Sequence, residues 1–204
     1  MYKSLNIVCV LLLVFSQQLM SQNIDVHKIP MELKISESSS LKLAGKTNVN
    51  KFECNYEGKF YKQDKIKFKK QRTYNIVEFE EFQLEIEVEQ LDCHKRVYNK
   101  TMLNLLEVSE HPEIIIKVHK ITFLSDFQEN GVMAYFNGLV TIAGVEKETI
   151  INLYKAEKTE NGLSFIGDVN LLMTQFQIEP PTKMGGAIKV MEELLVSVNL
   201  VFIQ

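Results

Sequence analysis

The sequence predicts an all-β protein in which about eight antiparallel strands, joined in chain order, close into an up-and-down barrel. Apolar and polar residues alternate with period two through most of the chain after residue 30, as they do in half-buried strands. Several alternating runs exceed about nine residues, which is long for a β-sandwich. Closing such strands into a barrel removes exposed sheet edges. Apolar residues at helical spacing occur in one stretch only, which predicts a short α-helix over residues 99–109.

The N-terminus predicts a secretory signal peptide over residues 1–21. Lys3 supplies a positive start, and residues 7–15 form a continuous apolar run that is too short to span a membrane. An uncleaved anchor is the alternative interpretation. Cys9 lies within the apolar run, whereas a lipoprotein signal needs a cysteine just after it. We therefore expect residues 22–204 to form one domain that is periplasmic or secreted and is not stably inserted in a membrane.

The charge of the chain argues against a nucleic-acid partner. Lys and Arg number 23 and Asp and Glu number 26; removing residues 1–21 takes away one lysine and leaves 22 positive against 26 negative charges. Only two arginines occur in the chain, so the sequence offers no arginine-rich face.

Two cysteines, Cys54 and Cys93, remain after the signal peptide. In an oxidising compartment they can form a disulfide, and closing a loop of about 40 residues stabilises a fold by roughly 4 kcal/mol in the chain-entropy model. Two buried free thiols, which behave as small apolar residues, are the alternative.

The first half of the chain contains four predicted strands. Residues 31–35 and 41–45 alternate on either side of a serine-rich turn. The clearest half-buried strand covers residues 52–60, and its apolar face carries Phe52, Cys54, Tyr56, Gly58 and Phe60. In the fourth strand, Phe82, Leu84, Ile86 and Val88 alternate with Gln83, Glu85 and Glu87. Residues 62–72 hold six basic residues, which we interpret either as an exposed strand face that pairs with the acidic strand or as a positive rim for a phosphate or carboxylate headgroup.

The helical stretch follows the fourth strand. Its inward face is formed by Met102, Leu105 and Leu106. Asn99 or Thr101 is expected to cap its start, and Pro112 to end it. In a barrel this helix is expected to cover one opening, either as a plug that completes the core or as a lid that gates a channel.

Five more strands are predicted over residues 114–123, 132–142, 150–154, 163–173 and 194–202. Gly144 breaks the second of these runs from the third, and Asn161-Gly162 is a strong hairpin signal. Prolines and glycines exclude residues 179–186 from a central strand. A mature chain of this length and pattern is of lipocalin size, so the predicted fold is a lipocalin-like barrel.

Catalytic and metal-binding motifs are not evident. The sequence has no phosphate-cradling glycine loop and no cysteine pair at metal spacing. His94, His111 and His119 fall in one region, but such histidines more often cap helices or lie on solvated faces. We therefore predict no enzyme, no metal and no cofactor.

The alternation instead predicts a large apolar interior, which can hold one small apolar ligand or be filled as plain core. The candidate lipid-binding residues are Phe52, Tyr56, Phe60, Leu84, Ile86, Val88, Met102, Leu105, Leu106, Phe136, Phe165, Val169, Met173, Phe176, Val198 and Leu200. Small residues among them, Gly58, Ala134, Gly138 and Gly167, are expected to leave room. The expected partner is an apolar long-chain lipid; the oligomeric state stays open, a homodimer included.

Five short motifs occur in the order typical of YceI-like proteins, and the chain resembles the divergent type of that family found in Bacteroidetes. They are Gly45-Lys-Thr-Asn-Val-Asn-Lys-Phe52-Glu-Cys54, Leu91-Asp-Cys93 before Asn99-Lys100-Thr101-Met102, Pro112-Glu-Ile114-Ile-Ile116, Gly138-Leu-Val-Thr-Ile-Ala-Gly144, and Met173-Thr-Gln-Phe176-Gln-Ile178-Glu-Pro180-Pro181. The last departs from the Arg-x-Asp-Phe-Gly of many members. The resemblance implies an exported, non-enzymatic lipocalin-like barrel whose channel holds a polyisoprenoid or isoprenoid quinone. A barrel with a filled core and a structural or envelope-stress role is the alternative.

Overall fold

The computed structural model describes residues 32–60, 66–68, 76–124, 133–159 and 162–203 of the chain. The predicted signal peptide, most of the basic run at 62–72 and the hairpin residue Asn161 lie outside the described residues.

The strands and helices are, in chain order, β1 (Glu32–Ile35), β2 (Ser40–Thr47), β3 (Lys51–Tyr56), β4 (Ile66–Phe68), β5 (Ile76–Glu81), β6 (Gln83–Glu87), η2 (Val88–Gln90), β7 (Leu91–Asp92), α2 (Arg96–Leu105), β8 (Glu113–Phe123), β9 (Ala134–Ile142), β10 (Val145–Thr159), β11 (Gly162–Leu172), η3 (Met173–Phe176), β12 (Thr182–Lys183), η4 (Met184–Gly186) and β13 (Ile188–Ile203). The elements labelled η are short 3-10 helices.

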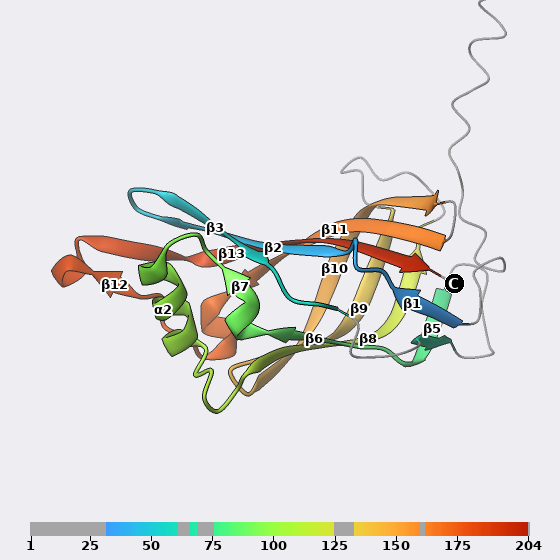
Figure 1. Ribbon diagram of the computed structural model, residues 1–204, viewed down its shortest axis with the longest axis horizontal. Helices are drawn as coiled ribbons and strands as arrows, with labels where there is room; N and C mark the ends of the chain where they lie inside the picture. The colour runs from blue at the N-terminus through green and yellow to red at the C-terminus, as the bar shows by residue number, and fades with distance from the viewer. Residues whose placement is uncertain (1–31, 61–65, 69–75, 125–132, 160–161, 204) are drawn as a thin grey trace, which may run out of the picture.

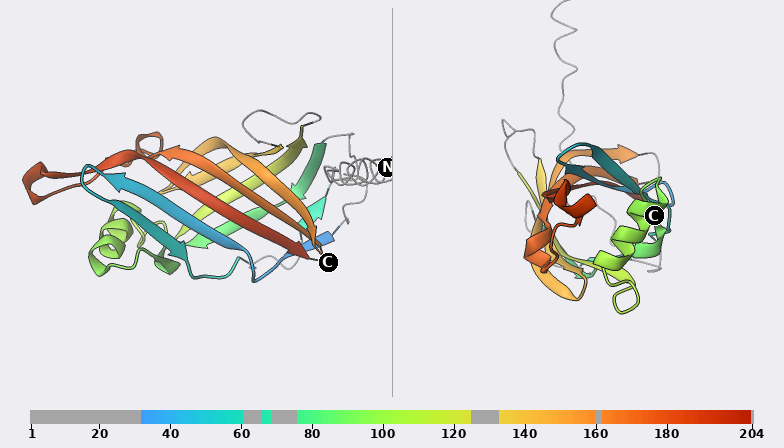
Figure 2. Two further views of the ribbon diagram at one scale, coloured as in Figure 1. Left: turned by 90° about the horizontal axis from the view of Figure 1, so that it is seen from above. Right: turned by 90° about the vertical axis from the view of Figure 1, so that its left-hand side faces the viewer.

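These strands make eight passes along a barrel wall (Figure 1). β1 leads into β2, β3 and β4 share the second pass, and β5, β6 and β7 follow one another on the third. β8, β9, β10, β11 and β13 take one pass each, and every pass pairs antiparallel with the next. The last pass closes on the first, because β13 pairs with both β1 and β2. The predicted up-and-down barrel is confirmed, and Figure 2 shows it end-on.

Along most strands of the wall, side chains that face the core alternate with side chains that face outward. Along β11 every second residue, from Leu163 to Leu171, is buried, and the intervening residues are half-buried or exposed. The basic run contributes β4, which pairs with the acidic β5 and sets Lys67 opposite Glu81, so the described part of the run belongs to the wall.

The helix differs from the predicted range. α2 covers Arg96–Leu105 instead of residues 99–109, and Lys95 precedes it without a side-chain cap. The expected capping by Asn99 or Thr101 is therefore wrong, because both residues lie inside the helix. The helix ends well before Pro112, since Glu107 adopts a left-handed conformation with φ of 49°.

Four residues predicted to face the interior lie outside the regular strands. Val88 begins η2, and Met173 and Phe176 begin and end η3, where the period of two no longer holds. β3 ends at Tyr56, so Phe60 follows the strand. All four side chains are nevertheless buried, because the turns keep them against the barrel interior.

Candidate functional site

A cavity of about 430 Å³ is lined in part by residues of α2. Figure 1 shows α2 at one end of the barrel. Nine of the predicted lipid-binding residues line the cavity, namely Phe52, Ile86, Met102, Leu105, Leu106, Val169, Met173, Phe176 and Val198. The inward face predicted for the helix, formed by Met102, Leu105 and Leu106, thus faces this cavity. Its volume falls within the range of about 300–1,000 Å³ that is typical of small-ligand sites.

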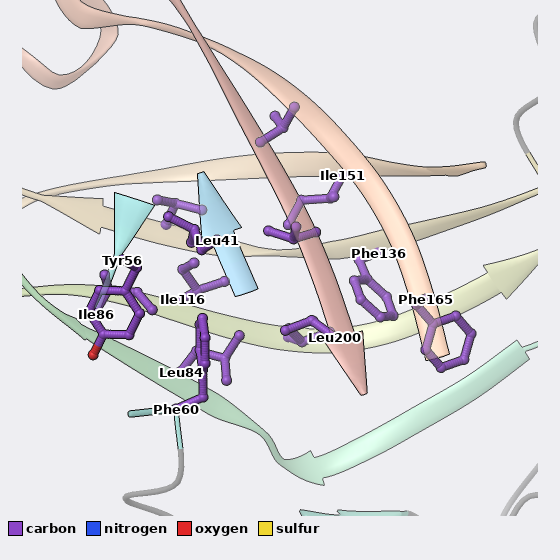
Figure 3. Close-up of a cluster of buried hydrophobic side chains, with 14 of the residues drawn as sticks. Leu41, Tyr56, Phe60, Leu84, Ile86, Ile116, Phe136, Ile151, Phe165 and Leu200 are labelled. Atoms are coloured by element: carbon purple, nitrogen blue, oxygen red, sulfur yellow. The ribbon is translucent and has the colours of Figure 1, made fainter. Parts of the chain in front are cut away.

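The other seven predicted residues do not line the cavity. Tyr56, Phe60, Leu84, Val88, Phe136, Phe165 and Leu200 are all buried, and they pack as core. Figure 3 shows several of them beside the cavity residues Ile86, Ile116 and Ile151. Alternation places both groups on the inner face, but only the assembled barrel separates those that line a cavity from those that pack.

Phenylalanines fill the barrel beyond the cavity. Ring centroids are 5.8 Å apart between Phe136 and Phe165, 5.6 Å between Phe165 and Phe202, and 5.9 Å between Phe202 and Phe82. A void of about 10 Å³, room for about one water molecule, remains beside Phe165 and Phe202. These aromatic side chains pack in the half of the barrel beyond the cavity, and none of them lines it.

The glycines expected to leave room do not line the cavity. A Cβ at Gly138 would meet the carbonyl oxygen of Lys117, and one at Gly167 would meet that of Asn152. These glycines therefore allow close approach of neighbouring strands. The expectation that they leave room is wrong. Alternation along a strand identifies the residues on the inner face, but it does not tell how closely neighbouring strands approach one another.

Several lining residues were not singled out from the sequence. Ile116, Val140 and Leu194 lie on the inner faces of predicted strands, so the same alternation would have found them. Four polar lining residues carry no periodic signal: Thr47 ends β2, Asn50 lies in the β2–β3 turn, Thr101 is in α2 and Lys183 is in the two-residue β12.

The cavity reaches the surface at the α2 end. Its lining includes Val49, which is 59% exposed, and Val97, which is 65% exposed. Lys183 of β12 is also exposed and lines it. The polar lining residues gather near this mouth, while the deeper wall is apolar.

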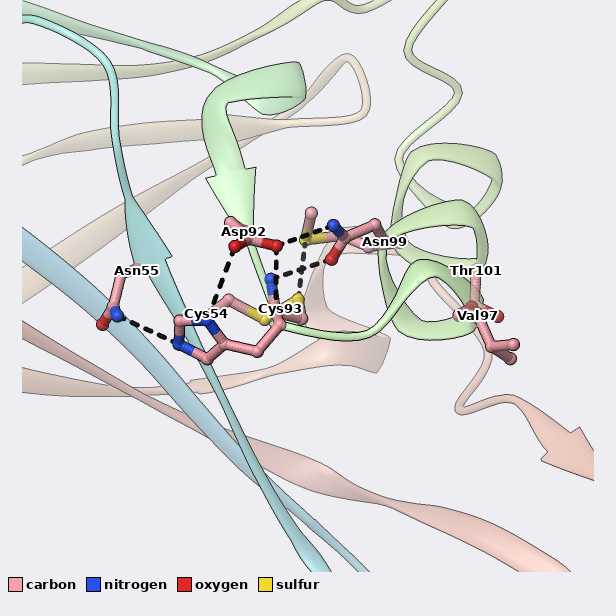
Figure 4. Close-up of a disulfide and its surroundings, with 9 residues drawn as sticks. Cys54, Asn55, Asp92, Cys93, Val97, Asn99 and Thr101 are labelled. Atoms are coloured by element: carbon pink, nitrogen blue, oxygen red, sulfur yellow. Dashed lines mark hydrogen bonds and ion pairs between the residues drawn. A yellow bond between two sulfur atoms is a disulfide. The ribbon is translucent and has the colours of Figure 1, made fainter.

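A disulfide between Cys54 and Cys93 fixes the segment that leads into α2 (Figure 4). β3 and β7 pair with Asn55 opposite Asp92, and extending this antiparallel register by one residue sets the two cysteines opposite each other. Of the two alternatives that the sequence left open, a disulfide and two free thiols, the structure contains the disulfide. The Sγ atom of Cys93 also lies 3.9 Å from the Sδ atom of Met102 on the helix.

Hydrogen bonds reinforce this junction. The side chain of Asn99 accepts from the backbone N–H of Cys93 at 2.8 Å and donates to Oδ1 of Asp92 at 2.8 Å. The Asn99 amide is the main cause that holds the pKa of Asp92 below its ordinary value of 3.8, and the backbone N–H of His94 is the second. Nδ1 of His94 lies 3.4 Å from Oδ2 of Asp92. Asn99 therefore ties α2 to β7 instead of capping the helix.

The three histidines of this region do not form one cluster in the described part of the chain. A different group of side chains brings atoms of the kind that ligate metals within 4.8 Å of one another. It consists of Glu107, Glu110 and His111 in the loop after α2. His94 and His119 are not in that group. Of the helices that the structure describes, none has the length and apolar character needed to cross a membrane.

No protein-family model and no curated protein matches the sequence. Solved structures do match the fold. BcnA of Burkholderia cenocepacia aligns over 80% of this chain and 95% of its own, with a TM-score of 0.60 and 16% identity. A polyisoprenoid-binding domain from Saccharophagus degradans, implicated in plant cell wall breakdown, aligns over 84% of this chain and 97% of its own, with a TM-score of 0.53 and 12% identity. A variant of the Campylobacter jejuni YceI protein aligns over 74% and 85%, with a TM-score of 0.50 and 15% identity.

The fold therefore defines a class: the chain has the antiparallel barrel fold of YceI and polyisoprenoid-binding proteins. The YceI-like resemblance predicted from the five sequence motifs is confirmed at the level of this fold.

Proposed function

We propose that this chain is an exported member of the YceI-like family that holds a long apolar chain compound, of the polyisoprenoid or isoprenoid-quinone class, for transport, storage or envelope stress response. The observation that carries the proposal is the cavity beneath α2. Its deep wall is apolar, and its polar lining residues stand at the mouth, where Thr47, Asn50, Thr101 and Lys183 lie. This arrangement suits a ligand with its tail inside and its headgroup at the opening.

Energetics support a chain compound. Each CH₂ moved from water into such a wall gains about 0.8 kcal/mol, so burying one five-carbon isoprene unit gains up to roughly 4 kcal/mol before ordering costs. Few directed polar contacts are needed for affinity of this kind. The proposed role is therefore binding, without catalysis.

The disulfide supports export. Disulfides persist in the periplasm and outside cells and are rare in the reducing cytosol. Together with the predicted signal peptide at residues 1–21, the Cys54–Cys93 bond favours an oxidising compartment. The alternative of a barrel with a filled core predicts no continuous cavity, which the 430 Å³ space contradicts for the α2 half of the barrel.

The test is solvent extraction of the protein purified from an exporting host, followed by mass spectrometry. An apolar chain compound is expected in the extract, and geranylgeraniol added to the delipidated protein is expected to bind. The comparison variant is Val198→Phe, which places an aromatic ring in the cavity. It should copurify with less lipid than the wild type. Repeated extracts without such a compound, together with no binding of added prenol or quinone, would refute the proposal.

A further inference from the structure

Three chain segments from distant parts of the sequence end together around the cavity mouth. They are the β2–β3 turn, the start of α2 and the β12–β13 hairpin, and Figures 1 and 2 place them at the same end of the barrel. We name residues 46–51, 94–101 and 182–190 the mouth rim. Contacts join its parts: Nδ2 of Asn48 donates to the carbonyl oxygen of Ala187 at 2.9 Å, and the backbone N–H of Lys189 donates to Oδ1 of Asn48 at 2.9 Å.

Each part of the mouth rim presents a large apolar side chain to solvent. Val49 at the β2–β3 turn is 59% exposed, Val97 in the first turn of α2 is 65% exposed, and Met184 between β12 and β13 is 79% exposed. Val49 and Val97 also border the cavity. Large apolar side chains exposed to solvent around the opening of an apolar cavity are typical of an interaction site.

The mouth rim is also strongly basic. It carries Lys46, Lys51, Lys95, Arg96, Lys100, Lys183 and Lys189, and its sequence contains no Asp or Glu. Acidic residues outnumber basic ones over the whole chain, 26 to 23, so positive charge is concentrated at this end. Three acids near the rim lie outside it: Asp92 of β7, whose Oδ2 is 3.4 Å from Nδ1 of His94, and Glu107 and Glu110 in the loop after α2.

We propose that the mouth rim docks on the surface of an anionic phospholipid bilayer. Exposed apolar side chains ringed by lysines are suited to the boundary between headgroups and acyl chains, and each Lys or Arg near an anionic surface contributes to binding. Val49, Val97 and Met184 enter the interface while the lysines meet phosphate headgroups. The cavity then faces the bilayer, so an apolar chain passes between them without crossing water. This inference goes beyond the proposed function, since the rim docks whether or not the cavity is filled.

The test is co-sedimentation of delipidated protein with vesicles of phosphatidylcholine alone and of equal parts phosphatidylcholine and phosphatidylglycerol. Binding is expected to the anionic vesicles and to weaken as salt rises. The double variant K51Q/K100Q is expected to lose about 25-fold in partition coefficient, at about fivefold per charge. Met184→Asp should lower the partition coefficient at least as much as removal of one rim lysine does. Met184 lies in an exposed turn, so this substitution leaves the barrel wall intact.

The matched control is K34Q/K155Q, which removes two exposed charges from β1 and β10 away from the mouth, and its binding should equal that of the wild type. Equal loss in control and rim variants, equal binding to neutral vesicles, or no sedimentation with either vesicle would overturn the proposal. In a further outcome, the protein binds single-stranded DNA as strongly as it binds anionic vesicles, and Met184→Asp changes neither affinity. That result would show a general polyanion-binding surface and would overturn the proposal. Because prenol binding is measured separately, failure of docking and failure of the proposed function are distinguished.

Discussion

Filling the cavity from its wall gives the sharpest test of the site. Val198 on β13 is 6% exposed and lines the cavity, whereas the next inward residue of the strand, Leu200, packs in the core and does not line it. Val198→Phe therefore projects four additional carbon atoms into the open space of the cavity. At about 0.8 kcal/mol per displaced CH₂ equivalent, a ligand that reaches this depth loses roughly 3 kcal/mol, or about 100-fold in affinity.

The assay is displacement of a fluorescent apolar probe by geranylgeraniol, with unfolding in urea measured on the same preparations. Val198→Phe should unfold near the wild-type midpoint, since the new ring enters space that is already empty. The matched variant Ala134→Leu enlarges a side chain that is 0% exposed in the packed half. It should lose about 1–3 kcal/mol of stability by overpacking and leave ligand affinity unchanged.

The reasoning is refuted if Val198→Phe binds geranylgeraniol as tightly as the wild type does, because the tail would then not occupy the cavity. It is equally refuted if both variants lose the same stability, because the two halves of the barrel would then be packed alike.

Four further predictions concern α2 and its junction with β7. Replacing Cys54 and Cys93 by alanine should lower the free energy of unfolding by about 4 kcal/mol in the chain-entropy model, measured in urea against the oxidised wild type; an unchanged midpoint would contradict this. Because the folded state lowers the pKa of Asp92, its ionised carboxylate stabilises the fold above the ordinary pKa of 3.8, and this contribution is lost as pH falls through the lowered pKa. Asp92→Asn should therefore flatten the acid limb of a stability–pH profile, and Asn99→Ala should cost about 1–2 kcal/mol at neutral pH by removing two hydrogen bonds. Leu105→Asp should weaken prenol binding more than it lowers the melting temperature, since Leu105 is only half-buried and lines the cavity; the reverse order would identify α2 as a plug.

Much of the wall could be predicted because strand alternation is a local property. Side chains on a strand point to opposite faces, so residues such as Phe165, Val169 and Leu200 were assigned to the interior from the sequence. The prediction was less accurate where the backbone leaves the extended conformation. Glu107, with its left-handed φ, ends α2 early, and Met173 and Phe176 belong to a 3-10 turn that breaks the period of two.

The sequence by itself determined the fold class, the inward faces of the strands, one short helix and the two cysteines available for a bond, because each depends on residue type and spacing along the chain. Tertiary structure alone decided how deep each inward residue lies. Strand register sets Val198 at the cavity and Leu200, two residues further, in the packed core, and it brings Cys54 opposite Cys93. It also gathers Val49, Val97 and Met184 around one mouth, since side chains from distant segments meet only when the barrel closes.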